Sequence, residues 1–219
     1  MLVTDNNTQI MECDLSELIL SIVIMGLLFV FYVVMSGLIP DDYIYHDIVL
    51  VGIYMSGIIY LYKKHPIDFA EELFKPSLLK YAVIGLMVIF LLYLQYYFRI
   101  EHEAASEEFT SLYNYKIFGK IAYLILGCIV IPTTEEILFR RYYYNILKNR
   151  YGILLGVIIS ISLFTAAHAF QSLNLYNIVL QGLIYTYVYE KSASIWSSII
   201  VHSFNNSMWF LVTYIAAVQ

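Results

Sequence analysis

The chain has 219 residues, of which 61% are apolar and 13% are charged, and its mean hydropathy is +0.72. An ordinary soluble domain has about 25% charged residues and cannot bury so many large apolar side chains, so a water-soluble fold is excluded. The net charge of −5 comes from 12 basic and 17 acidic residues without any basic block, which argues against nucleic acid as a partner.

The two cysteines lie in different settings, Cys13 in a polar tail and Cys128 in an apolar stretch. We therefore predict two free thiols and no disulfide. The N-terminal sequence MLVTDNNTQIMECDLSE is acidic and lacks the basic region of a signal peptide, so the first apolar helix is expected to be retained.

Hydropathy predicts about seven membrane spans and an all-α, polytopic transmembrane helical bundle. The apolar stretches are continuous rather than alternating, and open strand edges cannot exist in hydrocarbon. The polar breaks are short and none is rich in Pro or Ser, which predicts one integral domain with three spans in residues 1–116 and four in residues 117–219. The expected spans lie near residues 18 to 39, 46 to 62, 79 to 98, 117 to 149, 153 to 171, 174 to 190 and 194 to 217.

The distribution of Lys and Arg predicts the orientation, because cytoplasmic loops collect these residues. With seven spans, most of the basic residues fall on one side, and this places the N-terminus inside and the C-terminus outside. The residues of the inner side are Lys63, Lys64, Lys75, Lys80, Arg140, Arg141, Lys148, Arg150 and Lys191, and those opposite are Arg99, Lys116 and Lys120.

The fourth span contains charged residues, in the sequence Pro132-Thr-Thr-Glu-Glu-Ile-Leu-Phe-Arg140. A charge at the centre of a membrane helix costs about 2.5 to 3.5 kcal/mol, which makes such residues functional candidates. Glu136 and Arg140 stand one turn apart and are expected to form an ion pair, whereas Glu135 lies about 100° round the helix from Glu136 and lacks that partner. A buried carboxyl holds its proton at higher pH than an exposed one, which suits Glu135 as a general base. Pro132 should free backbone groups beside the site.

The fifth span carries Phe164-Thr-Ala-Ala-His168. The turn before it is centred near Tyr151 and Gly152, and Glu135 and His168 are each about sixteen residues from that turn. In an antiparallel hairpin the two side chains reach the same depth, so we predict that they can share one water.

The last span carries His202-Ser-Phe-Asn-Asn206, in which His202 and Asn206 are four residues apart on one face. An imidazole N–H and a carboxamide pointing the same way would make an oxyanion hole. Asn205 lies on a different face and is the weaker candidate.

These motifs, which read EEILFR, FTAAH and HSFNN in this order, resemble the CPBP family, the CAAX proteases and bacteriocin-processing enzymes also called the Abi family. The resemblance covers about residues 117 to 217 and implies an intramembrane endopeptidase, in a bacterial cell membrane, whose catalytic core is the last four helices. By that resemblance Glu135 and His168 would activate water, and His202 and Asn206 would hold the oxyanion. Three further residues would support the site, namely Glu136, Arg140 and Phe164.

The resemblance leaves the metal question open, since family members have been called metalloproteases and a metal-free glutamate mechanism is the alternative. The chain has no HExxH motif, and a zinc ion would need Glu135, His168 and His202 to converge. One departure from the family is Arg141, where a small residue is common. Its long side chain could reach the inner surface.

The same residues allow other interpretations. Thr133-Thr-Glu-Glu136 fits a capping box that would begin a helix at Thr134, and the histidines and Asn206 could be polar links between helices. At the level of function, the alternatives are a non-proteolytic membrane regulator or bacteriocin-immunity protein that binds a sensor kinase or a toxin, and a transporter with a proton relay. The expected partners of a protease are the bilayer and a peptide or protein substrate, such as a prenylated CAAX protein, a peptide pheromone or a bacteriocin precursor.

Overall fold

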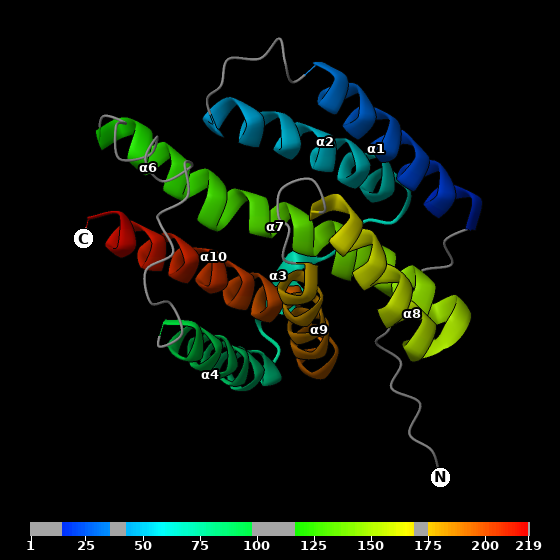
Figure 1. Ribbon diagram of the computed structural model, residues 1–219. Helices are drawn as coiled ribbons and strands as arrows, with labels where there is room; N and C mark the ends of the chain where they lie inside the picture. The colour runs from blue at the N-terminus through cyan, green and yellow to red at the C-terminus, as the bar shows by residue number, and fades with distance from the viewer. Residues whose placement is uncertain (1–14, 36–42, 98–116, 169–174, 219) are drawn as a thin grey trace.

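The computed structural model describes residues 15–35, 43–97, 117–168 and 175–218, and in these residues every regular element is a helix (Figure 1). A single helical rod made of four consecutive segments runs through the middle of the chain. In order, the elements are α1 (Leu15–Met35), α2 (Tyr43–Lys64), α3 (Phe69–Leu73), α4 (Ser77–Tyr97), the rod of α6 (Ile117–Ile125), the π-helical η2 (Leu126–Val130), α7 (Ile131–Glu136) and the π-helical η3 (Ile137–Tyr144), and then α8 (Asn145–His168), α9 (Leu175–Ser192) and α10 (Ile195–Val218).

The all-helical prediction is confirmed, and each expected span coincides with a long helix or with the rod. Residues 36–39, 98, 169–171 and 174 of those spans lie outside the described residues, as does Cys13. Cys128 is a buried free thiol, as expected. The short helix α3 was not predicted. It begins at Asp68, whose side chain accepts hydrogen bonds from the N–H groups of Ala70 and Glu71.

Several helices are long and apolar enough to cross a membrane, which indicates an integral membrane protein. Four stretches of the described residues meet this condition, namely Leu15–Val34, Tyr45–Lys64, Ser77–Leu94 and Gly119–His168. The last has 50 residues and reverses direction at Gly152, so it supplies two antiparallel arms. The helices α9 and α10 do not meet the condition, since polar side chains interrupt their apolar sequence.

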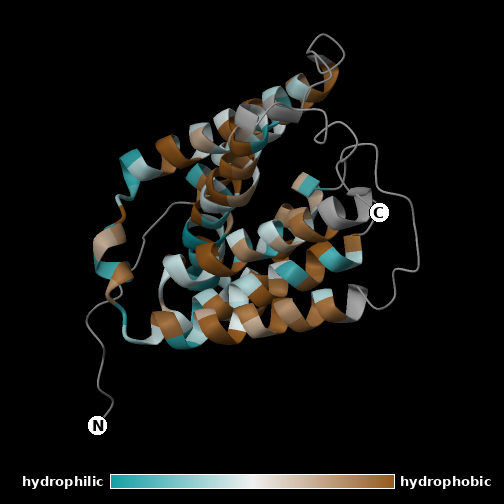
Figure 2. Cartoon of the chain, turned by 90° about the vertical axis from the view of Figure 1, so that its left-hand side faces the viewer, coloured by the Kyte–Doolittle hydropathy of each residue, from teal (hydrophilic) through white to brown (hydrophobic). Residues whose placement is uncertain are grey.

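Many large hydrophobic side chains of the helices are exposed, and hydrophobic residues recur along the helices in Figure 2. Leu27 is 66% exposed, Val34 72% and Leu154 72%. Burial of one such side chain is worth about 1.5–3 kcal/mol, so this surface is suited to lipid rather than water.

The turn between the rod and the following arm is built by two glycines. Gly152 has φ +84°, a conformation that favours glycine, and it reverses the chain inside α8. A Cβ on Gly156 would lie 2.9 Å from the backbone N of Lys148, so the returning arm can approach the preceding turn only without a side chain there. Ser160 then donates a hydrogen bond to the carbonyl oxygen of Phe139, 2.9 Å away, and joins the two arms. The predicted antiparallel hairpin is confirmed.

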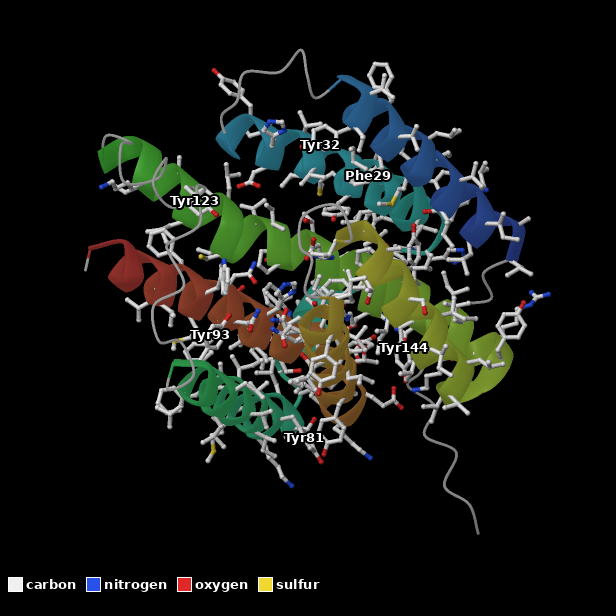
Figure 3. All side chains as sticks on the ribbon, viewed as in Figure 1. Phe29, Tyr32, Tyr81, Tyr93, Tyr123 and Tyr144 are labelled. Atoms are coloured by element: carbon white, nitrogen blue, oxygen red, sulfur yellow. The ribbon has the colours of Figure 1, made fainter. Side chains whose placement is uncertain are left out.

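Helix α10 lies between the central rod and α4, and its contacts with both bury the polar motif of the last span (Figures 1 and 3). Tyr93 of α4 donates a hydrogen bond to the carbonyl oxygen of Asn205, at 3.2 Å. Tyr123 of α6 packs against Phe210 of α10, with 6.1 Å between the ring centroids. The motif is therefore held from two sides.

The start of α10 is bound by the loop helix α3. The Glu72 carboxylate accepts a hydrogen bond from the backbone N–H of Ile195, 2.7 Å away, and its other oxygen lies 2.7 Å from Nε of Arg141. Burial raises the pKa of Glu72, and the guanidinium of Arg141 partly offsets that rise. Arg141 thus has a protein partner instead of extending freely to the surface, as its length alone had suggested. A second ion pair, between Lys148 and Glu190, joins the start of α8 to α9.

Candidate active site

The centre of the bundle holds a fully buried ion pair between Glu136 and Arg140, as predicted, with 2.9 Å between Oε1 and Nη1. The Glu136 carboxylate also faces His202, whose Nδ1 lies 2.8 Å from Oε1, and it accepts a short hydrogen bond from the hydroxyl of Ser198. A buried carboxylate needs several such partners. Here two of them come from α10, which ties that helix to the rod.

Glu135 lies next to this cluster and is 2% exposed, but its environment differs. Its Oε1 is 3.5 Å from Nε2 of His168, and its Oε2 is 3.7 Å from Nε2 of His202. Among the described residues, Oε2 has no hydrogen-bond partner. The structure therefore brings Glu135 together with His168, which the sequence placed at equal depth, and also with His202, and it leaves the acid an unused acceptor.

The other nitrogen of each imidazole is engaged, and this determines which nitrogen holds the proton. Nδ1 of His168 lies 2.8 Å from the carbonyl oxygen of Phe164, and Nδ1 of His202 faces the Glu136 carboxylate. Both partners are acceptors, so each Nδ1 carries a hydrogen. In the neutral form, both Nε2 atoms then present a lone pair to Glu135.

The side chain of Asn206 bonds to the backbone of η2 close to Pro132, which lacks an N–H group. In η2 the N–H of Ile131 donates to the carbonyl oxygen of Leu126, the π-helical pattern of five residues. The same pattern would bond the Gly127 carbonyl to residue 132, which is a proline without N–H. Nδ2 of Asn206 donates to that carbonyl instead, at 2.8 Å. Pro132 thus frees a backbone group beside the site, as predicted, and Asn206 has one N–H engaged and one remaining.

The capping-box interpretation of residues 133–136 is wrong. Helical residues precede Thr134 without a break, and the hydroxyls of Thr133 and Thr134 donate to the carbonyl oxygens of Ile129 and Ile131 rather than accepting from N–H groups ahead of them. Backbone donors inside a continuous helix already have partners, so a threonine there bonds backward.

Aromatic rings form the walls of the site. Phe164 lies against Arg140, with 4.2 Å from the guanidinium carbon to the ring centroid, and against His168, with 4.4 Å between centroids. Tyr185 of α9 stacks on His202 at 4.4 Å. The rings shield the charges from lipid and limit rotation of the imidazoles.

Three residues of this site were not singled out from the sequence. Ser198 lies one turn before His202 on the same face of α10, a spacing that could have identified it. Tyr185 and Tyr54 have no such signal, because they are two of 22 tyrosines and belong to other helices. Tyr54 of α2 is 3% exposed, and its ring packs edge to face on Phe139 of the rod.

The zinc site that Glu135, His168 and His202 could form does not fit the residues as they are placed. Within the part of the chain that the structure describes, no three His, Cys, Asp or Glu side chains are arranged to hold a metal ion.

Residues 117–208 match the family of type II CAAX prenyl endopeptidase Rce1-like proteins. This match, which covers 92 of the 219 residues, supports an intramembrane protease of the CPBP type. The match begins with α6 and ends within α10, so it contains all three motifs, and the resemblance seen in them is confirmed. Tyr54 lies outside it. A comparison with curated proteins and with solved structures gave no match. The CPBP family is one of membrane proteases, which accords with the long apolar helices.

Proposed function

We propose that this chain is an intramembrane endopeptidase that hydrolyses a peptide bond with water activated by Glu135 and His168. The observation that carries the proposal is the placement of Glu135, a buried carboxylate with a free acceptor oxygen and two imidazole nitrogens within 3.7 Å. An acid and imidazoles that converge on one buried point are candidates for a general base and its partners.

The proposed reaction has no covalent intermediate. A water bonded to Glu135 and to Nε2 of His168 loses a proton to Glu135 while its oxygen attacks the carbonyl carbon of the substrate. The resulting tetrahedral intermediate collapses when the amide nitrogen takes that proton from Glu135 and the carbon–nitrogen bond breaks. The products are a free carboxylate and a free amine, and the enzyme returns to its initial state.

His202 and Asn206 are proposed to bind the oxyanion. Because Nδ1 of His202 is held by Glu136, Nε2 can donate only when the imidazole is positively charged. A charged imidazole would lie against the Glu136 carboxylate, which also pairs with Arg140. Asn206 would donate through the N–H that Gly127 does not use.

The substrate class follows from the family and from the depth of the site. We propose a peptide or protein that reaches the site from within the membrane, with a prenylated CAAX segment as the first candidate and an apolar pheromone or bacteriocin precursor as the second.

Peptide-terminus proteomics of membranes tests the function. Membranes with the wild-type chain are compared with membranes carrying Glu135→Gln, and Glu71→Gln serves as the matched control because its side chain is 59% exposed on α3. We expect new peptide termini in the wild type and the control that are absent from Glu135→Gln at equal protein abundance. Identical termini in all three membranes would refute the proposal. If the biological effect of the chain also persisted in Glu135→Gln, a non-proteolytic regulator or immunity protein would replace it.

A further inference from the structure

One wall of the candidate active site is supplied by Tyr185 of α9, a helix that carries none of the three motifs. The ring of Tyr185 is stacked on the imidazole of His202, with 4.4 Å between the centroids and 20° between the planes. Tyr185 is 0% exposed, and its hydroxyl has no hydrogen-bond partner among the described residues. The contact of this side chain with the site is therefore made by the face of the ring.

The position of the ring is determined by the packing of α9 around it. The carbonyl oxygen of Tyr185 lies 3.2 Å from the hydroxyl of Ser198, which is also bonded to Glu136. One turn earlier in α9, Gly182 allows close packing on α8, since a Cβ there would lie 3.3 Å from Cγ2 of Ile161. Helix α9 is thus held against both α10 and α8 at the level of the ring.

The imidazole of His202 needs this contact because its hydrogen bond leaves one rotation open. Nδ1 lies 2.8 Å from Oε1 of Glu136, whereas Nε2 lies 3.7 Å from Oε2 of Glu135, which is beyond a strong hydrogen bond. A single bond holds one point of a flat ring and lets the ring turn about that bond. A parallel ring at stacking distance restricts the plane. Phe164 meets the imidazole at 76°, with 6.1 Å between centroids, and restricts the plane less.

We propose that Tyr185 is the positioning residue of His202, and that the face of its ring keeps Nε2 directed toward Glu135 and the reacting group. This inference rests on the proposed function in taking His202 as an oxyanion donor. A misplacement of about 1 Å at a reacting group can lower a rate by about a hundredfold. Loss of the ring should therefore reduce kcat by about 10- to 100-fold, with little change in KM.

The first measurement is the motion of the His202 imidazole in the full-length chain in detergent micelles. NMR relaxation of the imidazole C–H bonds gives an order parameter for the ring, and His202→Gln identifies the signals. Tyr185→Leu removes the ring of Tyr185, Tyr185→Phe keeps it, and Tyr187→Leu is the matched control because it removes a ring that is 50% exposed from the same helix. We expect the order parameter to fall in Tyr185→Leu and to stay at the wild-type value in the other two variants.

The second measurement is cleavage of a farnesylated peptide ending in a CAAX sequence, and the thermal transition of each variant shows whether it is folded. If Tyr185→Leu does not fold, Tyr185→Met takes its place in both measurements. A lower kcat in Tyr185→Leu that Tyr185→Phe recovers, with KM unchanged, supports the proposal.

Two results would overturn the proposal. One is an order parameter in Tyr185→Leu equal to that of the wild type. The other is a loss of kcat in Tyr185→Phe as large as that in Tyr185→Leu, since the hydroxyl and not the ring would then be responsible. If the wild type leaves the peptide intact while the order parameter still falls in Tyr185→Leu, the positioning by Tyr185 stands and the proposed prenyl-peptide activity fails.

Discussion

Truncation of Asn206 should destabilise the protein much more when residue 132 is proline than when it is alanine. The Asn206 side chain replaces the donor that Pro132 lacks, by bonding to the Gly127 carbonyl at 2.8 Å. In Asn206→Ala that carbonyl is left without a partner, because the N–H of Ile131 is engaged with Leu126. In Pro132→Ala the backbone N–H of residue 132 becomes available, so the carbonyl no longer depends on α10.

The size of the effect follows from the cost of an unsatisfied carbonyl. A buried acceptor without a partner costs about 1–3 kcal/mol, and side-chain hydrogen bonds between membrane helices are worth about 0.6 to 1.7 kcal/mol. We expect Asn206→Ala to lower the free energy of unfolding by about 1.5 kcal/mol in the wild-type background. In the Pro132→Ala background the loss should be smaller by about 1 kcal/mol.

A double-mutant cycle measures this coupling. The four proteins are unfolded with SDS in mixed micelles, and the fluorescence of Trp196 and Trp209 reports the transition. Ser207→Ala is the control, since its hydroxyl bonds to Ser203 on the exposed side of α10 and should not couple to Pro132. If the stability losses of Asn206→Ala and Pro132→Ala sum to that of the double variant within about 0.3–0.5 kcal/mol, the two residues are not coupled. Asn206 would then not replace the missing donor, and the account of η2 would be wrong.

Three further results are expected. Ser198→Ala removes a hydrogen bond to the buried Glu136 carboxylate and should lower the free energy of unfolding by about 1.5–3 kcal/mol in the same SDS titration; a loss no greater than that of Ser207→Ala would contradict the bond. Burial raises the pKa of Glu72 in the folded protein above its value in the unfolded chain. The protonated carboxyl therefore stabilises the fold fully below the unfolded-state pKa, and this stabilisation is lost as pH rises through the folded-state pKa. As pH rises between these two pKa values, the melting temperature of the wild type should fall relative to that of Glu72→Gln. Plots of melting temperature against pH that run parallel for the two proteins would refute the raised pKa. Treatment with EDTA should leave the melting temperature and peptide cleavage unchanged, whereas inactivation with recovery on adding zinc would show that the side chains rearrange around a metal.

The depth of the site could be predicted from the sequence because helix rise is nearly constant. Glu135 and His168 are equally far from Gly152, and the structure brings their side chains to 3.5 Å. The pair between Glu136 and Arg140 was predictable for the same reason, since it spans one turn of one helix. The oxyanion role of Asn206 stays a prediction, although the structure adds a second use for its carboxamide.

Contacts between distant helices could not be predicted in this way. Tyr54 of α2 packs against Phe139 of the rod, and Tyr185 of α9 stacks on His202. Neither tyrosine follows a spacing rule, because the rotation of one helix against another depends on the packing of many side chains at once.

The sequence by itself determined the long helices and the common depth of Glu135 and His168, since hydrogen bonding within a helix is local and the bilayer requires it. It also showed the resemblance to the CPBP family, because the motif residues occur in a fixed order along the chain. The tertiary structure alone decided which nitrogen of each histidine carries the proton, which donor reaches the Gly127 carbonyl and which tyrosine stacks on His202. These features depend on the distance and direction between groups far apart in the chain, and packing sets both.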